Sequence, residues 1–180
     1  MKKTILTIVS TLVIFIIGFI IYISSGLYDI SQLTPHNVLT KWVIQKTKHS
    51  SIERRMKENQ IPADLNDTSN IIEGFRHYDE MCTDCHGAPG IEPDELAAGL
   101  YPKPPKIYKH ASQEDPQEFF WIIKNGIKMT SMPAYGATHT DQKIWAITAF
   151  VTMKLNKISP QEYREWRKKY GKPEEEGDSD

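Results

Sequence analysis

The feature that most constrains this chain is a pair of cysteines with a histidine directly after the second, because residues 82–86 read Cys-Thr-Asp-Cys-His. The Cys-X-X-Cys-His pattern is the attachment signature of a c-type haem. On a helix, positions i and i+3 share a face, so the thiols of Cys82 and Cys85 can both reach the vinyl groups of one porphyrin. His86 can then turn its ring to the iron as an axial ligand. The chain has no other cysteine, and we therefore expect one covalent haem.

Two other chemistries use Cys-X-X-Cys pairs, and both fit this sequence less well. A redox-active disulfide normally follows a strand rich in Val, Ile and Thr, whereas the residues before Cys82 have a helical pattern. A zinc site generally needs a second pair of ligands. The remaining histidines show no metal-binding spacing: they are His36, His49, His77, His110 and His139. Haem is the favoured interpretation, with thiol or metal chemistry as the alternatives.

The N-terminal segment 1–26 predicts a membrane anchor. Lys2 and Lys3 precede a charge-free stretch, in which residues 5–23 are mostly Ile, Leu, Val and Phe. A helix of this length spans roughly 28 Å, close to the thickness of a bilayer core. The two lysines favour an N-terminus on the inner side. We therefore expect a single-pass protein of the cytoplasmic membrane, with its haem domain on the periplasmic side.

A cleavable signal sequence is the alternative for the same segment. The apolar region of a signal sequence is shorter, about 7–15 residues, although Ser24-Ser25-Gly26 has the small residues of a cleavage site. In either case the globular part is exported. Export agrees with the haem, because c-type attachment in bacteria takes place outside the cytoplasmic membrane.

Residues 27–69 form a connector between the apolar segment and the haem domain. Four apolar residues follow one helical stripe, and basic residues come after them; the stripe consists of Val38, Leu39, Trp42 and Val43. The favoured interpretation is a short amphipathic helix that packs on the domain. The alternative is a segment that lies along the membrane surface. The net charge of −1 gives no basic surplus that would indicate a nucleic-acid partner.

Helical patterns occur on both sides of a proline-rich stretch. Asn70 and Glu73 have the spacing of a capping box, and an apolar periodicity leads from there to Cys82 and ends at Gly87. Pro102, Pro104 and Pro105 oppose regular structure within residues 91–114. No segment has the pattern of a strand, so we expect an all-α fold.

Two further helices are predicted after the prolines. Asp115-Pro116 begins the first, and Gly126 ends it. Its residues 119–123 are apolar on nearly every side and should be buried. The second begins near Thr140 and carries an apolar face that extends to Leu155.

The C-terminal segment 158–180 predicts a short helix and a tail. The helix is expected from Gln161 to Tyr170, with most of its charged side chains in solvent. The acidic residues from Glu174 to Asp180 are expected to be disordered.

The loop between the last two predicted helices of the domain supplies a thioether. Met129 and Met132 both lie in residues 126–136, where the sequence has no periodicity. A lone methionine usually belongs to the core. Pro133 fixes the backbone beside Met132, which favours Met132 as the second axial ligand. On these grounds, however, the sulfur of either Met129 or Met132 can reach the iron.

With these motifs in place, residues 70–155 resemble the class I cytochromes c. The Cys-X-X-Cys-His motif, the Met132-Pro133 pair and the final helix with Trp145 and Phe150 occur in the family's order. The string 126–145 is similar to single-haem, membrane-anchored bacterial cytochromes in particular. The resemblance implies a haem-wrapping helical fold and assigns the distal ligand role to Met132.

The same resemblance makes two structural predictions. Gly74 and Tyr78 match the glycine and the aromatic residue with which the family's first helix contacts the last one. Pro104-Pro105 is similar to the family's proline-containing loop beside the proximal histidine. The resemblance places the cytochrome c domain at 70–157, between the connector and the C-terminal segment.

The expected function is one-electron transfer between respiratory redox partners, not enzymatic catalysis. If His86 and Met132 take both axial positions, the iron has no open site for a small-molecule substrate. A neutral His/Met pair and an apolar shell both raise the reduction potential. The alternative is a haem enzyme or gas sensor with a labile distal ligand, in which His110 or His139 acts as a distal base. A third possibility is electron transfer as an obligate subunit of an oxidoreductase complex.

Overall fold

The computed structural model describes residues 1–110 and 115–171, and these divide into two compact units. The first unit is Met1–Pro35. It contains helix α1 (Lys2–Ser24), whose side chains are all exposed. By length and composition α1 is able to cross a membrane. This is consistent with the predicted anchor.

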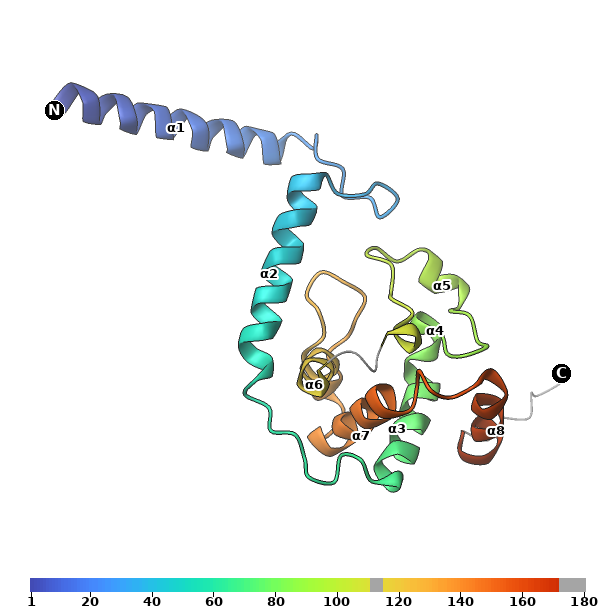
Figure 1. Ribbon diagram of the computed structural model, residues 1–180. Coiled ribbons are helices and arrows are strands. Elements are labelled where there is room, and N and C mark those ends of the chain that lie inside the picture. The colour runs from blue at the N-terminus through green and yellow to red at the C-terminus, as the bar shows by residue number, and fades with distance from the viewer. Residues whose placement is uncertain (111–114, 172–180) are drawn as a thin grey trace. The chain divides into compact units, whose positions relative to one another are not determined.

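The second unit begins at His36 and is helical (Figure 1). Within the described residues it contains no strand, and its one β-bridge joins Ala88 and Ile91. The predicted all-α class is therefore confirmed. Its elements are α2 (Val38–Met56), α3 (Thr68–Met81), α4 (Thr83–His86), α5 (Glu95–Ala98), η1 (Ile107–Lys109), α6 (Pro116–Asn125), η3 (Tyr135–Ala137), α7 (Asp141–Met153) and α8 (Pro160–Tyr170).

The centre of the second unit is the crossing of α3 and α7 (Figure 1). Gly74 is buried in α3, and a Cβ atom added there would lie 1.9 Å from the carbonyl oxygen of Ala146 in α7. The two backbones approach this closely because the glycine has no side chain. Tyr78 and Phe150 bring their ring centroids to 5.5 Å beside this contact. The predicted meeting of Gly74 and Tyr78 with the last helix of the domain is confirmed.

Helix α8 closes one side of α3. Tyr163 is fully buried, and its ring lies 5.2 Å from that of Phe75. Its hydroxyl donates a hydrogen bond to the carboxylate of Asp79 at 3.0 Å, and Nε of Arg167 lies 3.2 Å from the same carboxylate. The predicted helix is present, and most of its charges are exposed as expected. The interaction of Arg167 with a buried acid was not predicted, because it joins residues far apart in the sequence.

The predicted starts of α6 and α7 agree with the structure, whereas the predicted start of α3 is too late in the sequence. The side chain of Asp115 caps α6 by accepting from the backbone N–H of Gln117, and Thr140 caps α7. In contrast, α3 begins at Thr68, so Asn70 is not its cap. The Asn70 side chain instead donates to the carbonyl of Asp64 at 2.7 Å. A local alternative partner therefore replaces the predicted capping box.

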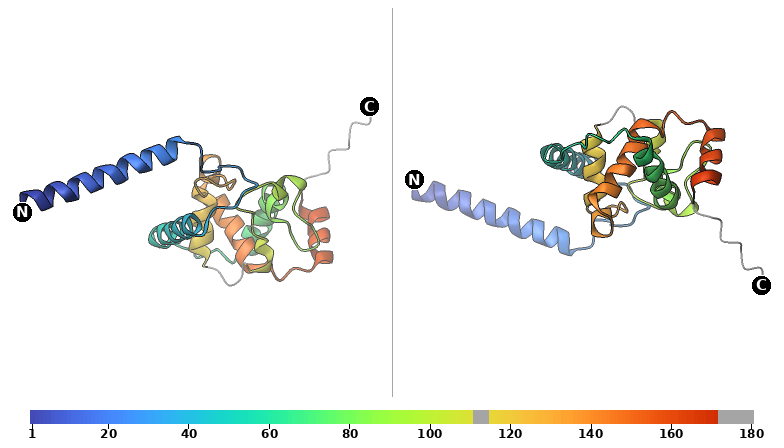
Figure 2. Two further views of the ribbon diagram at one scale, coloured as in Figure 1. Left: turned by 90° about the horizontal axis from the view of Figure 1, so that it is seen from above. Right: turned by 90° about the horizontal axis from the view of Figure 1, so that it is seen from below.

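Helix α6 lies between α2 and α7 (Figure 2). Of its apolar run, Phe120 and Ile123 are buried, whereas the other three side chains are half-buried. The prediction that the whole run is buried was therefore wrong for those three. A helix at the edge of the unit buries only the faces that its neighbours cover.

Helix α2 contacts α6, and its one buried residue is Ile52 near its C-terminal end. The prediction that the helix of this connector packs on the domain is therefore correct for the second half of α2 only. The apolar residues of its first half are exposed. The predicted acidic tail, 174–180, lies outside the described residues.

Candidate functional site

Cys82 and Cys85 lie in one helical turn at the end of α3. Helix α3 ends at Met81, and Cys82 joins it to the four-residue helix α4. The Thr83 hydroxyl donates to the carbonyl of Asp79 at 2.8 Å, and the backbone N–H of His86 donates to the carbonyl of Cys82 at 2.8 Å. These bonds fix the turn, so the predicted i, i+3 relation of the two thiols is present.

The imidazole of His86 is held by a second segment. Its Nδ1 lies 2.8 Å from the carbonyl oxygen of Pro105. Because a carbonyl can only accept, Nδ1 carries the proton and Nε2 keeps its lone pair. Burial lowers the pKa of His86, which favours the neutral ring. A neutral imidazole with its other nitrogen bonded to a carbonyl is the form that ligates a metal. The predicted proline loop beside His86 is present.

The residues after His86 are fastened to α3. The hydroxyl of Tyr78 donates to the carbonyl of Gly87 at 2.6 Å, and burial raises the pKa of this tyrosine well above its usual value. Gly87 has a φ of +66°, and a Cβ atom there would lie 2.7 Å from the carbonyl oxygen of Ile91. Only glycine fits this turn without strain. The turn therefore fixes where the chain leaves the Cys-X-X-Cys-His motif.

Met132 lies in a closed loop after α6. The backbone N–H of Ile127 donates to the carbonyl of Met132 at 3.2 Å, across the turn that Gly126 makes with a φ of +64°. Met132 is half-buried and packs against the core, whereas Met129 is 89% exposed. The two methionines that the sequence left open on residue grounds therefore occupy different environments.

Tyr135 connects this loop to the cysteines. Its hydroxyl donates to the carbonyl of Met81 at 3.2 Å. Burial raises its pKa to about 12, with the neighbouring Cys82 and Cys85 as smaller causes that act in the same direction. The loop of Met132 and the end of α3 are therefore in contact. No sequence motif identified Tyr135 as part of the site. Its position three residues after Met132 is the one feature of the sequence that could have indicated it.

The environment of Cys82 opposes free-thiolate chemistry. Burial raises the pKa of Cys82 to about 12, with Cys85 and Asp84 as smaller causes. The thiolate is the form that attacks disulfides and binds zinc, and reactive cysteines have a lowered pKa. In residues 1–110 and 115–171, no three or more His, Cys, Asp and Glu side chains are grouped to hold a metal. The disulfide and zinc alternatives therefore gain no support.

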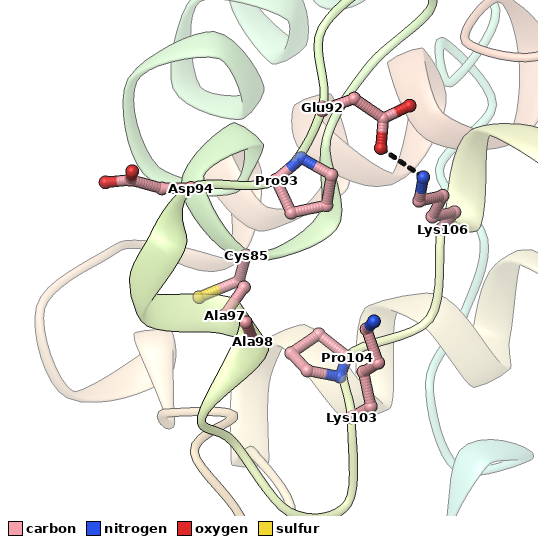
Figure 3. A pocket seen from close by; sticks show the side chains of 9 residues that line it. All are labelled: Cys85, Glu92, Pro93, Asp94, Ala97, Ala98, Lys103, Pro104 and Lys106. Carbon is pink, nitrogen blue, oxygen red and sulfur yellow. Dashed lines mark hydrogen bonds and ion pairs between the residues drawn. The ribbon is translucent and has the colours of Figure 1, made fainter.

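The side chain of Cys85 lines a pocket of about 130 Å³ (Figure 3). Pro104 lies across the pocket from Cys85, and Lys106 and Glu92 form an ion pair at its edge. The pocket therefore brings the second cysteine and the proline loop of His86 to one place.

These side chains fit a haem. The site offers a neutral imidazole nitrogen and a thioether sulfur, which are suitable axial ligands for haem iron. It also offers two thiols with no other partner. The partly buried apolar side chains that pack against the core include Ile91, Ile107, Tyr108, Phe119 and Met132.

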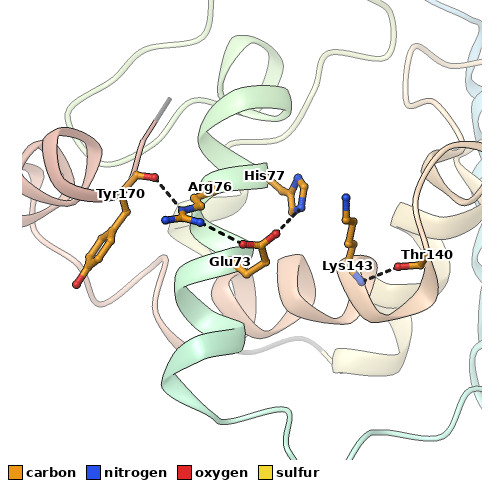
Figure 4. A network of polar contacts seen from close by, with 6 residues as sticks. All are labelled: Glu73, Arg76, His77, Thr140, Lys143 and Tyr170. Atoms are coloured by element: carbon orange, nitrogen blue, oxygen red, sulfur yellow. Dashed lines mark hydrogen bonds and ion pairs between the residues drawn. The ribbon is translucent and has the colours of Figure 1, made fainter. Parts of the chain in front are cut away.

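His77 and His139 contact each other, and His139 also contacts Tyr135 with ring centroids 5.6 Å apart. His77 Nε2 is 3.2 Å from a carboxylate oxygen of Glu73, which also contacts Arg76 (Figure 4). The His77 ring packs on that of His139 at 5.5 Å, and His110 is exposed. His77 and His139 are therefore packed side chains, and His110 lies at the surface.

A comparison with known families matches residues 69–151 to the family described as cytochrome C oxidase, cbb3-type, subunit III. No curated protein and no solved structure matches the chain. Together with the helical fold and the Cys-X-X-Cys-His turn, the match shows that this region is a c-type cytochrome domain. Such a domain binds haem c and serves electron transfer.

Proposed function

We propose that this protein is a membrane-tethered electron carrier with one covalent haem c on the periplasmic side of the cytoplasmic membrane. Cys82 and Cys85 form the thioethers, and His86 and Met132 are the axial ligands. The observation that carries the proposal is the bond between His86 Nδ1 and the carbonyl of Pro105, which leaves the lone pair of Nε2 available on the residue that follows Cys85.

Met132 is the better candidate for the second axial position. Its side chain packs against the core, whereas that of Met129 extends into solvent with 89% exposure. The contact of Tyr135 with Met81 holds the loop of Met132 against the end of α3. Pro133 further restricts the backbone beside the sulfur.

Such a site favours electron transfer over catalysis. Bound in this way, haem iron supplies a one-electron ferric–ferrous couple. If His86 and Met132 hold the iron, no open position would remain for a small-molecule substrate. The neutral ligands and the apolar side chains around them favour the less charged ferrous state and raise the reduction potential.

The proposed division of the chain follows from these roles. Residues 1–26 anchor the protein, 27–69 connect, 70–157 bind the haem, and 158–180 form the C-terminal helix and tail. The apolar composition of α1 and the lysines before its apolar core support an anchor with the domain outside. The partners would be respiratory redox proteins in or near the same membrane.

The test of covalent attachment uses the full chain, expressed with haem-attachment machinery. We expect haem staining on a denaturing gel and a c-type spectrum in the oxidised and reduced states. The variant Cys82→Ala/Cys85→Ala should lose all staining, and His86→Ala should lose the native spectrum. His139→Ala is the matched control and should retain both. Haem that stays on the double variant through the gel would refute the attachment.

A further inference from the structure

The first half of α2 carries an apolar face that nothing in the described structure covers. The exposed fractions of Val38, Leu39 and Trp42 are 87%, 69% and 64%. Together with Val43 they fall at helical positions i, i+1, i+4 and i+5, which lie on one side of a helix. A tryptophan with this exposure is uncommon in the surface of a protein that meets only water.

This face belongs to a helix that is fixed to the domain. The other end of α2 buries Ile52 and contacts α6, and the carbonyl of Asn59 accepts from the side chain of Gln117. The N-terminal end is capped, because the side chain of Asn37 accepts from the N–H of Thr40 at 2.9 Å. The apolar face is therefore presented in one orientation by the folded unit.

The charge of the helix indicates what the face meets. Between Val38 and Met56 there are five basic residues and one acidic residue. Basic side chains near a membrane surface attract anionic lipid headgroups. Apolar and tryptophan side chains on one side with basic residues around them are typical of interfacial helices. An acidic protein surface would also attract this charge, and the test below separates that outcome from contact with a bilayer.

The chain itself keeps the helix close to a bilayer. Residues 25–37 are all that separates α1 from α2. Even fully extended, this segment reaches about 45 Å. If α1 spans the membrane, the first turn of α2 is held near the outer surface at a high effective concentration.

We propose that the first half of α2 lies in the headgroup region of an anionic bilayer. Val38, Leu39, Trp42 and Val43 enter the interface, and the lysines contact lipid phosphates. Because the far end of α2 is packed on α6, this contact would also fix the orientation of the haem domain on the membrane. The inference rests on the membrane anchor of the proposed function.

The test places single spin labels on the full haem protein in vesicles of phosphatidylethanolamine and phosphatidylglycerol. Under the proposed function the native cysteines are consumed by haem, so the parent protein should take no label. Leu39→Cys and Trp42→Cys report on the apolar face, and Glu165→Cys on α8 is the water-exposed reference. The measured quantity is the ratio of collisions with oxygen to collisions with a neutral nickel complex.

We expect this ratio to be several-fold higher at positions 39 and 42 than at 165, and to fall in Lys41→Gln/Lys46→Gln/Lys48→Gln. Ratios equal to that at 165 would overturn the inference. Low collision rates with both reagents would also overturn it, because they indicate contact with protein. Failure of the protein to float with vesicles contradicts the anchor as well, whereas flotation with water-exposed labels overturns this inference alone.

Discussion

The α3–α7 crossing and the Met132 loop both depend on a glycine, but in different ways. Gly74 lies at the crossing of two helices, where backbone contacts backbone and the rings of Phe75, Tyr78 and Phe150 are fully buried. Gly126 turns the chain at the end of α6, and its loop is held by single hydrogen bonds from Ile127 and Tyr135. The crossing is stabilised by burial of apolar surface, whereas the loop is positioned by a turn and a few polar contacts.

This difference assigns separate tasks to the two regions. Buried apolar surface contributes roughly 25 cal/mol per Å², so the crossing supplies most of the stability of the domain. Hydrogen bonds contribute about 1 kcal/mol each, so the loop adds little stability but determines where Met132 lies. Substitutions in the two regions should therefore affect different measurements.

The largest effect on stability is expected from Gly74→Ala. The new Cβ atom would overlap the carbonyl oxygen of Ala146, which belongs to backbone and has no rotamer to change. We expect a loss of about 3 kcal/mol in the free energy of unfolding, the upper end for overpacking. Denaturant unfolding followed by circular dichroism measures it. Gly99→Ala is the matched control, because its Cβ would meet only an ordinary contact of 3.7 Å. Equal stability of the two variants would contradict close packing at the crossing.

A smaller loss, about 2 kcal/mol, is expected from Tyr163→Phe. The variant removes a hydrogen bond to the buried carboxylate of Asp79.

The contribution of Tyr163 should also depend on pH. Burial raises the pKa of Tyr163 above its usual value near 10. The hydroxyl therefore stabilises the fold fully below about pH 10 and loses this contribution at higher pH, by about 1.4 kcal/mol per pH unit. The stability difference between the wild type and Tyr163→Phe should narrow as the pH rises above 10. A difference that stays constant to pH 11 would show that the hydroxyl is not buried in this way.

Gly126→Ala should have the smallest effect on stability and a clear effect on the loop. Its Cβ would lie 2.7 Å from the carbonyl oxygen of Met132, and its φ of +64° strains any residue with a side chain. We expect about 1.5 kcal/mol of destabilisation, because a left-handed backbone is unfavourable for alanine and the loop backbone must shift to accommodate the new Cβ. The reduced haem should also become accessible to carbon monoxide, measured by absorption. If Gly126→Ala binds carbon monoxide no better than Gly99→Ala does, the turn at Gly126 does not determine where Met132 lies.

The sequence predicted what depends on local chemistry. The cap at Asp115 and the turn at Gly126 located α6, because both act within a few residues. The same reasoning failed for the capping box predicted at Asn70. The Asn70 side chain donates instead to the carbonyl of Asp64, six residues earlier. The Asp79–Tyr163 bond and the Tyr135–Met81 bond join positions 84 and 54 residues apart, so no local pattern encodes them.

The site was predicted to a similar extent. Cys82, Cys85 and His86 were found from their spacing, and the loop at Pro105 from the family resemblance. Spacing did not separate Met132 from Met129, because the difference lies in burial, which follows from how the loop packs on the core. The roles of Cys82, Cys85, His86 and Met132 in binding haem remain predictions.

The most direct test of the closed haem site compares Met132→Ala with Met129→Ala in the full protein. Absorption spectra are recorded oxidised, reduced, and reduced under carbon monoxide. The wild type and Met129→Ala should give a c-type spectrum that carbon monoxide leaves unchanged, whereas Met132→Ala should bind carbon monoxide with a clear spectral shift. A wild-type protein that binds carbon monoxide, or a Met132→Ala variant with an unchanged spectrum, would contradict the account.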